Sequence, residues 1–175
     1  MPQGRIAVYA GSFDPITNGH MYILRQGAAI FDTLVAAVGS NPDKKYDFPV
    51  EERMRLIREC AKDISNLRVD RFDNEYLVVY AARIGATHLV RGIRHEDDFQ
   101  FERTLRHVNE DIHPGIAAVY FMPPRALSEV SSSFIKGLVG PSGWEKVVAK
   151  YVPAPVLDAL KDLHQRRKSA KPAGK

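Results

Sequence analysis

The sequence contains one cysteine and no apolar run that approaches the roughly 20 residues needed to span a bilayer. Cys60 by itself cannot form an internal disulfide and fits no metal-finger spacing, so we expect a half-buried structural thiol rather than a nucleophile. The first residues also lack the longer apolar region of a secretory signal. We therefore expect a cytoplasmic protein that does not contact a membrane.

Two common phosphate-binding motifs are missing as well. The chain has neither G-x-G-x-x-G nor G-x-x-x-x-G-K-[ST], which excludes the usual dinucleotide fingerprint and the P-loop. The histidines outside the first loop have no mutual spacing typical of metal ligands: His88, His95, His107, His113 and His164. Any phosphate site in this chain must therefore be of another kind.

The charge of the chain is concentrated at its C-terminus. The net charge of the 175 residues is +4, and Gln165–Lys175 carries five basic residues and no acid. Those five charges exceed the net charge by one, so the remainder is close to neutral and a nucleic-acid partner is not expected. We expect one domain over residues 1–164 and a disordered basic tail over residues 165–175.

Short apolar runs alternate with amphipathic segments along the chain. We expect strands at Arg5–Tyr9, Thr33–Val38, Leu67–Phe72, His88–Arg91 and Ile116–Met122. We expect helices at Asn18–Phe31, Val50–Ile64, Tyr76–Ile84 and Glu96–Val108, and a helical segment from Ser132 onward. Strands separated by helices predict a doubly wound, Rossmann-like α/β domain with a five-stranded parallel sheet, helices on both faces and a C-terminal helical segment. The strands read as continuous apolar runs, as in a sheet covered on both sides.

In such a sheet the ligand site lies beyond the carboxyl ends of the strands. Gly11–His20 (GSFDPITNGH) follows the first strand and combines Ser, Thr, Gly and His within ten residues. Thr17 can cap the next helix, Gly19 leaves room for a phosphate, and His20 can donate a hydrogen bond to it. A plain turn with a solvent-facing histidine is the alternative.

The other strand ends carry further candidate phosphate ligands. Lys44 and Lys45 follow the second strand, and Arg91 and Arg94 follow the fourth. Ser131, Ser132 and Ser133 precede an apolar helical run and could form an anion cradle. Each has a structural alternative: a solvated lysine pair, an arginine salt bridge to Glu96, Asp97 or Asp98, and simple helix capping. Glu102 alone is typical of a solvated acid that pairs with Arg106.

Together these motifs resemble the nucleotidylyltransferase superfamily with its T/H-x-G-H motif, here Thr17–His20, and within it the phosphopantetheine adenylyltransferases. The resemblance covers roughly residues 5 to 160 and includes KK, FPVEER, HLVRGIR, DFQFE and the SSS run in the same order. It implies transfer of the adenylyl group of ATP to 4′-phosphopantetheine, which gives dephospho-coenzyme A and pyrophosphate by direct in-line attack. Ser12 keeps the hydroxyl of the family threonine, whereas Glu129 places an acid in the nucleotide-binding stretch.

The resemblance also implies roles for individual residues. The catalytic residues are His20, which stabilises the transition state, together with Lys44 and Arg91. The acceptor is bound by Ser12, Lys44, Leu77 and Arg91. The ATP-binding set is Ser12, Phe13, His20, Gly92, Ile93, Arg94, Glu102, Leu127, Ser128, Glu129, Val130, Ser131, Ser132 and Ser133. Mg²⁺ is expected as a bridge between phosphate oxygens, although no carboxylate cage is visible.

The family further implies a homohexamer of two stacked trimers and feedback by coenzyme A. Two other functions remain open at this point. One is a nucleotidylyltransferase that uses another phosphorylated acceptor, such as nicotinate mononucleotide. The other is a non-catalytic nucleotide sensor on the same fold.

Overall fold

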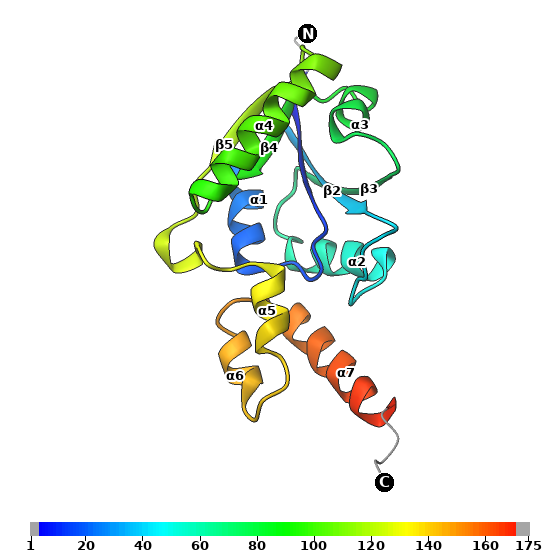
Figure 1. Cartoon of the computed structure of the whole chain (residues 1–175), viewed down its shortest axis with the longest axis vertical. Coiled ribbons are helices and arrows are strands. Elements are labelled where there is room, and N and C mark those ends of the chain that lie inside the picture. Colours follow the sequence, from blue (N-terminus) through cyan, green and yellow to red (C-terminus); the bar gives the residue numbers. More distant parts are fainter. Residues whose placement is uncertain (1–3, 171–175) are drawn as a thin grey trace.

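Strands and helices alternate along residues 4–170, the part of the chain that the computed structural model describes (Figure 1). The strands are β1 (Ile6–Gly11), β2 (Thr33–Ser40), β3 (Leu67–Asp73), β4 (His88–Gly92) and β5 (Ala117–Phe121). The helices between them are α1 (Asn18–Ile30), α2 (Val50–Cys60), α3 (Leu77–Arg83) and α4 (Glu96–Ile112). After β5 come the 3₁₀ turn η1 (Arg125–Leu127) and helices α5 (Ser132–Leu138), α6 (Trp144–Val148) and α7 (Ala154–Ala170).

The five strands form one parallel sheet in the order β3-β2-β1-β4-β5. This confirms the predicted doubly wound α/β fold. The chain first builds outward from β1 to β3 and then returns to place β4 on the other side of β1. The switch point therefore lies between β1 and β4, and the crevice at their carboxyl ends is where such folds bind ligands.

Alternate residues of the central strands face two separate cores. Tyr9 of β1 and Val38 of β2 belong to the larger core, which also contains buried side chains of α1, α2, α5, α6 and α7. Val8 and Val35 point the other way, into a smaller core with α3. Because side chains alternate across a strand, an apolar run with no polar position fills both faces of the sheet. Figure 1 shows α5, α6 and α7 gathered at one end of the molecule.

Three sequence expectations have a structural outcome here. The edge strand β3 is not a continuous apolar run, because Arg68 and Asp70 are exposed on it. The basic segment is not disordered over residues 165–170, since α7 continues to Ala170 and Arg167 Nη2 donates to Asp47 Oδ1 at 2.8 Å. Residues 171–175 lie outside the described range. Cys60 is half-buried, and burial raises the pKa of its thiol to about 11.

Candidate active site

Two adjoining cavities open at the carboxyl edge of the sheet. The β1–β4 cavity, about 350 Å³, lies over the switch point and is lined by His20, Arg94 and Ser131–Ser133, among others. The β2–β3 cavity, about 830 Å³, lies over the ends of β2 and β3 and reaches Leu77. Five residues line both cavities: Ala10, Ser12, Lys44, Arg91 and Phe101. The cavities therefore meet at a hydroxyl, a lysine and an arginine, all of them groups that bind phosphate.

His20 occupies the third position of α1 and its ring is fixed by the helix cap. Thr17 caps the helix through its side chain, and the Thr17 backbone N–H donates to His20 Nδ1 at 3.1 Å. Since Nδ1 accepts this hydrogen bond, the ring proton of the neutral imidazole is on Nε2. Burial and the nearby Arg94 guanidinium lower the pKa of His20 to about 4. The ring therefore lines the cavity as a neutral N–H donor, rather than facing solvent.

The first loop and the serine run are held against each other. An added Cβ on Gly19 would lie 3.0 Å from the Val130 carbonyl oxygen, so this glycine allows the two backbones to approach closely. Ser131 caps α5 by accepting from the Phe134 N–H at 3.1 Å, and Ser132 Oγ donates to the Pro15 carbonyl at 2.8 Å. Ser131 therefore caps the helix, and all three serines line the β1–β4 cavity.

Both arginines after β4 are paired with acids of α4. Arg91 donates from Nε to Glu102 Oε2 at 2.8 Å, and its Nη2 donates to Glu102 Oε1. Arg94 donates from Nε and Nη2 to Asp98 at 2.9 and 3.1 Å. The alternative considered for Glu102, a solvated acid paired with Arg106, is wrong, because Glu102 is 9% exposed and bound to Arg91, while Arg106 pairs with Glu110. Among the described residues, neither Nη1 has a hydrogen-bond partner, which leaves one side of each fork free.

Lys44 and Leu77 lie on the acceptor side of the predicted site. Lys44 is exposed in the loop after β2 and lines both cavities, whereas its neighbour Lys45 lines neither. Leu77 opens α3 and lines the β2–β3 cavity together with Phe72 and Tyr76. This cavity has a polar end at Lys44 and an apolar wall, as a phosphorylated ligand with an organic arm would need.

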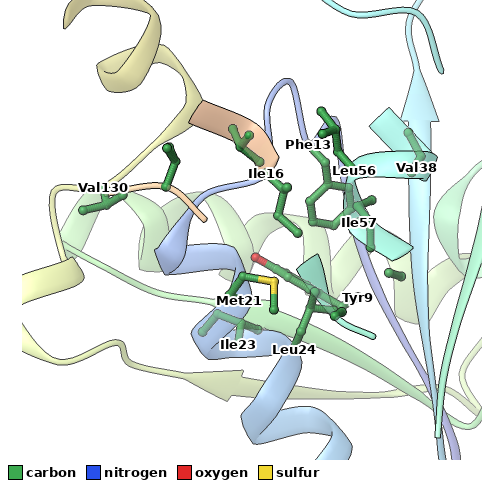
Figure 2. Close-up of a cluster of buried hydrophobic side chains, with 14 of the residues drawn as sticks. Tyr9, Phe13, Ile16, Met21, Ile23, Leu24, Val38, Leu56, Ile57 and Val130 are labelled. Carbon is green, nitrogen blue, oxygen red and sulfur yellow. The ribbon is translucent and has the colours of Figure 1, made fainter. Parts of the chain in front are cut away.

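Four of the predicted nucleotide contacts do not line either cavity: Phe13, Ile93, Ser128 and Glu129. Phe13 is 1% exposed, and Figure 2 shows its ring pointing into the core near Leu56. Its φ of +47° turns the chain sharply while the ring packs edge-on against Tyr9 and His20. Ile93 is also buried. Because the side chains of Phe13 and Ile93 are buried, only their main-chain atoms could contact a ligand.

An ionic cluster that the sequence did not predict lies beneath the first loop. Asp14 is 1% exposed and accepts from the backbone N–H groups of Asp47 and Phe48 at 3.0 and 2.9 Å. It also pairs with Lys136 Nζ of α5 at 3.0 Å, and Lys136 lines the β1–β4 cavity. An Asp-Pro pair in a loop is typical of a turn, so the sequence carried no sign that this carboxylate is buried.

The described residues offer no ready metal site. Residues 4–170 contain no group of three or more His, Cys, Asp or Glu side chains that could hold a metal ion. The three carboxylates that line the β1–β4 cavity are Asp14, Asp98 and Glu102, and each is paired with a cationic side chain. These residues do not fit a protein-held Mg²⁺ site, so the expected Mg²⁺ would have to be bound through phosphate oxygens.

The fold and the site define the class of this protein. The doubly wound parallel sheet, the T-x-G-H sequence that ends in His20 and the serine-capped start of α5 meet at the switch point, in keeping with the resemblance to the nucleotidylyltransferases. Residues 8–138 match the family described as Cytidylyltransferase-like. The solved nicotinic acid mononucleotide adenylyltransferase of Plasmodium falciparum has the same fold, with a TM-score of 0.64 at 14% identity over 90% of this chain and 95% of that one.

Curated relatives define the family more narrowly. The phosphopantetheine adenylyltransferase of Chromobacterium violaceum is 49% identical over 92% of this chain and 98% of its own length. That of Neisseria meningitidis serogroup C is 47% identical over 92% of this chain and 95% of its own. The chain belongs to the phosphopantetheine adenylyltransferase family. In the part that the structure describes, no helix has the length and apolar character needed to cross a membrane.

Proposed function

We propose that this enzyme transfers the adenylyl group of ATP to 4′-phosphopantetheine and so forms dephospho-coenzyme A and pyrophosphate. Family membership supports the choice of reaction. The observation that carries it is the meeting of two cavities at Ser12, Lys44 and Arg91. Two phosphorylated substrates can thus lie end to end, with their phosphates at the junction and the acceptor arm against the apolar wall of the β2–β3 cavity.

The chemistry requires positioning rather than a covalent intermediate. A phosphate oxygen of the acceptor is already nucleophilic near neutral pH and attacks the α-phosphorus of ATP in line. The bond from the α-phosphorus to the bridging oxygen of the β-phosphate breaks, and pyrophosphate leaves with the electron pair. The main task of the protein is therefore to hold two mutually repelling anions and to stabilise charge on the α-phosphate.

Each cavity supplies part of this task. Ser12, Lys44 and Arg91 bind the acceptor phosphate, and Leu77 contacts its arm. His20 donates its Nε2 proton to an α-phosphate oxygen, where charge develops. Arg94 and the N-terminal turn of α5 bind the departing pyrophosphate. The other predicted nucleotide contacts complete the ATP site in this proposal: Phe13, Gly92, Ile93, Glu102 and Leu127–Val130.

Two acids of α4 fix the orientation of the Arg91 and Arg94 guanidinium groups. Glu102 and Asp98 bind the Nε and Nη2 side of each fork and hold its plane at the cavity wall. The Nη1 donors of both arginines then remain for phosphate oxygens. An arginine held in this way loses less conformational entropy when it binds a phosphate.

Mg²⁺ is part of the proposal as the counter-ion of ATP, bound by phosphate oxygens and water. When it is bound, it neutralises charge on the triphosphate. A cytoplasmic location and feedback by coenzyme A are also proposed on the strength of the family resemblance alone.

A homohexamer is proposed as the assembled state. Helix α4 has 17 residues, yet among them only Glu102 is buried. Several large apolar side chains of α4 and of the β5 region are exposed: Phe99, Phe101, Val108, Ile112, Tyr120 and Met122. Burial of such a surface against other subunits would be favourable. Light scattering coupled to size exclusion tests this, and a monomer at working concentrations would contradict it.

Pyrophosphate release tests the reaction. The enzyme is supplied with ATP and Mg²⁺ together with 4′-phosphopantetheine, nicotinate mononucleotide or no acceptor. Of the three assays, we expect only the one with 4′-phosphopantetheine to release pyrophosphate, and one dephospho-coenzyme A should form for each pyrophosphate. Turnover with nicotinate mononucleotide instead would support the alternative acceptor class. ATP binding with no turnover on either acceptor would support the nucleotide sensor.

A further inference from the structure

Arg53 is a buried cation without an acidic partner. It lies in the first turns of α2, its side chain is 2% exposed, and it forms no ion pair with any residue between 4 and 170. Burial lowers the pKa of its guanidinium, but an arginine remains charged. Burying a charge is costly unless polar contacts compensate for it. The nearby Asp14 carboxylate favours the charged form of Arg53, and the rest of the compensation comes from its hydrogen bonds.

Those contacts join three segments at the carboxyl edge of the sheet. Nη1 donates to the carbonyl oxygens of Ser12 and Gly39 at 2.7 and 3.1 Å, and Nη2 donates to Ser40 Oγ at 3.0 Å. The guanidinium also stacks on the Tyr46 ring, 4.1 Å from its centroid. Arg53 thereby connects the first loop, the end of β2 and the loop that carries Lys44.

The loop from Asn41 to Tyr46, which carries Lys44, is folded around the Tyr46 ring. The Tyr46 hydroxyl accepts a hydrogen bond from the Asn41 N–H at 2.8 Å, which closes the loop around Lys44. The Lys44 ammonium lies 5.8 Å from the centroid of the Tyr46 ring. A shift of the guanidinium would therefore move the ring on which this loop is folded.

Most residues that Arg53 contacts line the β2–β3 cavity rather than the β1–β4 cavity. Gly39, Ser40 and Tyr46 line the β2–β3 cavity and not the β1–β4 cavity. Ser12 alone lines both. Arg53 lines neither of these two cavities, although it lines a third one on the other side of the Lys44 loop. Its effect on a ligand in the first two cavities is therefore exerted through the segments that it holds.

We infer that Arg53 is a positioning residue for the acceptor, which holds Ser12 and the Lys44 loop in the geometry that binds the acceptor phosphate. This rests on the proposed function. A lysine could supply the charge but not the planar fork that reaches two carbonyls and a hydroxyl while stacking on a ring. The inference predicts an effect on acceptor kinetics that is separable from ATP binding.

The test compares Arg53→Lys and Arg53→Met with the matched control Arg55→Met. Arg55 is two residues along the same helix, exposed, and paired with Glu52 and Glu59 on the surface. We expect kcat/KM for 4′-phosphopantetheine to fall between about tenfold and a hundredfold in Arg53→Met and less in Arg53→Lys, because small displacements of binding groups have effects of this size. The KM for ATP should stay within about twofold in both, and Arg55→Met should match the wild type.

Folding and activity are separated by measuring each constant per active site, with active sites counted by binding of labelled ATP. If Arg53→Met does not fold, Arg53→Lys decides, since it retains the charge and most of the volume. An Arg53→Lys enzyme with wild-type acceptor constants would overturn the inference, as would an equal rise of the ATP and acceptor KM values. Failure of the wild-type enzyme to release pyrophosphate with this acceptor would instead overturn the proposed function.

Discussion

His20 presents one N–H group to the β1–β4 cavity, and its removal is the most direct test of the catalytic geometry. His20 Nδ1 accepts from the Thr17 N–H, so His20→Ala removes one preorganised donor from the cavity and also leaves the Thr17 N–H without its side-chain acceptor. The Thr17 side chain still caps α1. Loss of one such donor to a transition-state oxyanion costs about 2.7–4 kcal/mol, or about a hundredfold to a thousandfold in kcat. Since the imidazole is neutral, we expect the lower end of this range.

The assay is pyrophosphate release at saturating ATP and 4′-phosphopantetheine, with ATP affinity measured separately. We expect kcat to fall about a hundredfold in His20→Ala while ATP binding changes little, because the donor acts mainly in the transition state. His113→Ala is the control, since this exposed histidine at the end of α4 lines neither cavity. Near-normal turnover of His20→Ala with intact ATP binding would refute the role assigned to His20.

The protonation state of His20 can be checked without turnover. Long-range ¹H–¹⁵N spectra of the free enzyme should show the Nε2–H tautomer and a pKa of about 4. The folded pKa lies below the unfolded value of 6.5, so the unfolded chain binds more protons between these values and stability falls as the pH drops from 6.5 toward 4. His20→Gln should lose this part of the pH dependence. A His20 ring that titrates near 6.5 would contradict the structure.

Three further substitutions probe the framework of the site. Glu102→Gln leaves Arg91 without its carboxylate partner. We expect the free energy of unfolding, measured by urea titration, to fall by about 2–4 kcal/mol and the acceptor KM to rise. An unchanged stability would contradict the buried pair. Asp14→Asn turns an amide group toward two N–H donors and leaves Lys136 unpaired. We expect the free energy of unfolding to fall by about 2–3 kcal/mol. A decrease below about 0.5 kcal/mol would argue against the ionic cluster. Ser131→Ala removes the cap of α5 and should lower the free energy of unfolding by about 1 kcal/mol. It should raise the KM for ATP but not the KM for the acceptor, in contrast to Arg53→Met.

Much of the fold could be predicted because its signals are local. Apolar runs bounded by helical segments identified all five strands, and their order along the chain implied parallel pairing. Element ends were less accurate: α2 ends at Cys60 rather than Ile64, and α4 continues to Ile112. The basic segment was misjudged because its charge suggests a solvated tail, whereas Val156 and Leu160 of the same helix pack into the larger core. The pattern shows that a segment can be helical, but only its partners decide how far the helix continues.

The sequence by itself determined which strand ends carry Ser12, His20, Lys44 and Arg91, because a parallel sheet places every carboxyl end at one edge. The tertiary structure decided how these groups are held. Glu102 binds Arg91 rather than its helical neighbour Arg106, and the Phe13 side chain is in the core. Asp14 and Arg53 are buried beneath the loops that they connect. These contacts join residues up to 122 positions apart, as in Asp14 with Lys136. Spacing along the chain reveals neighbours on one element, and only the packing of elements reveals partners across them.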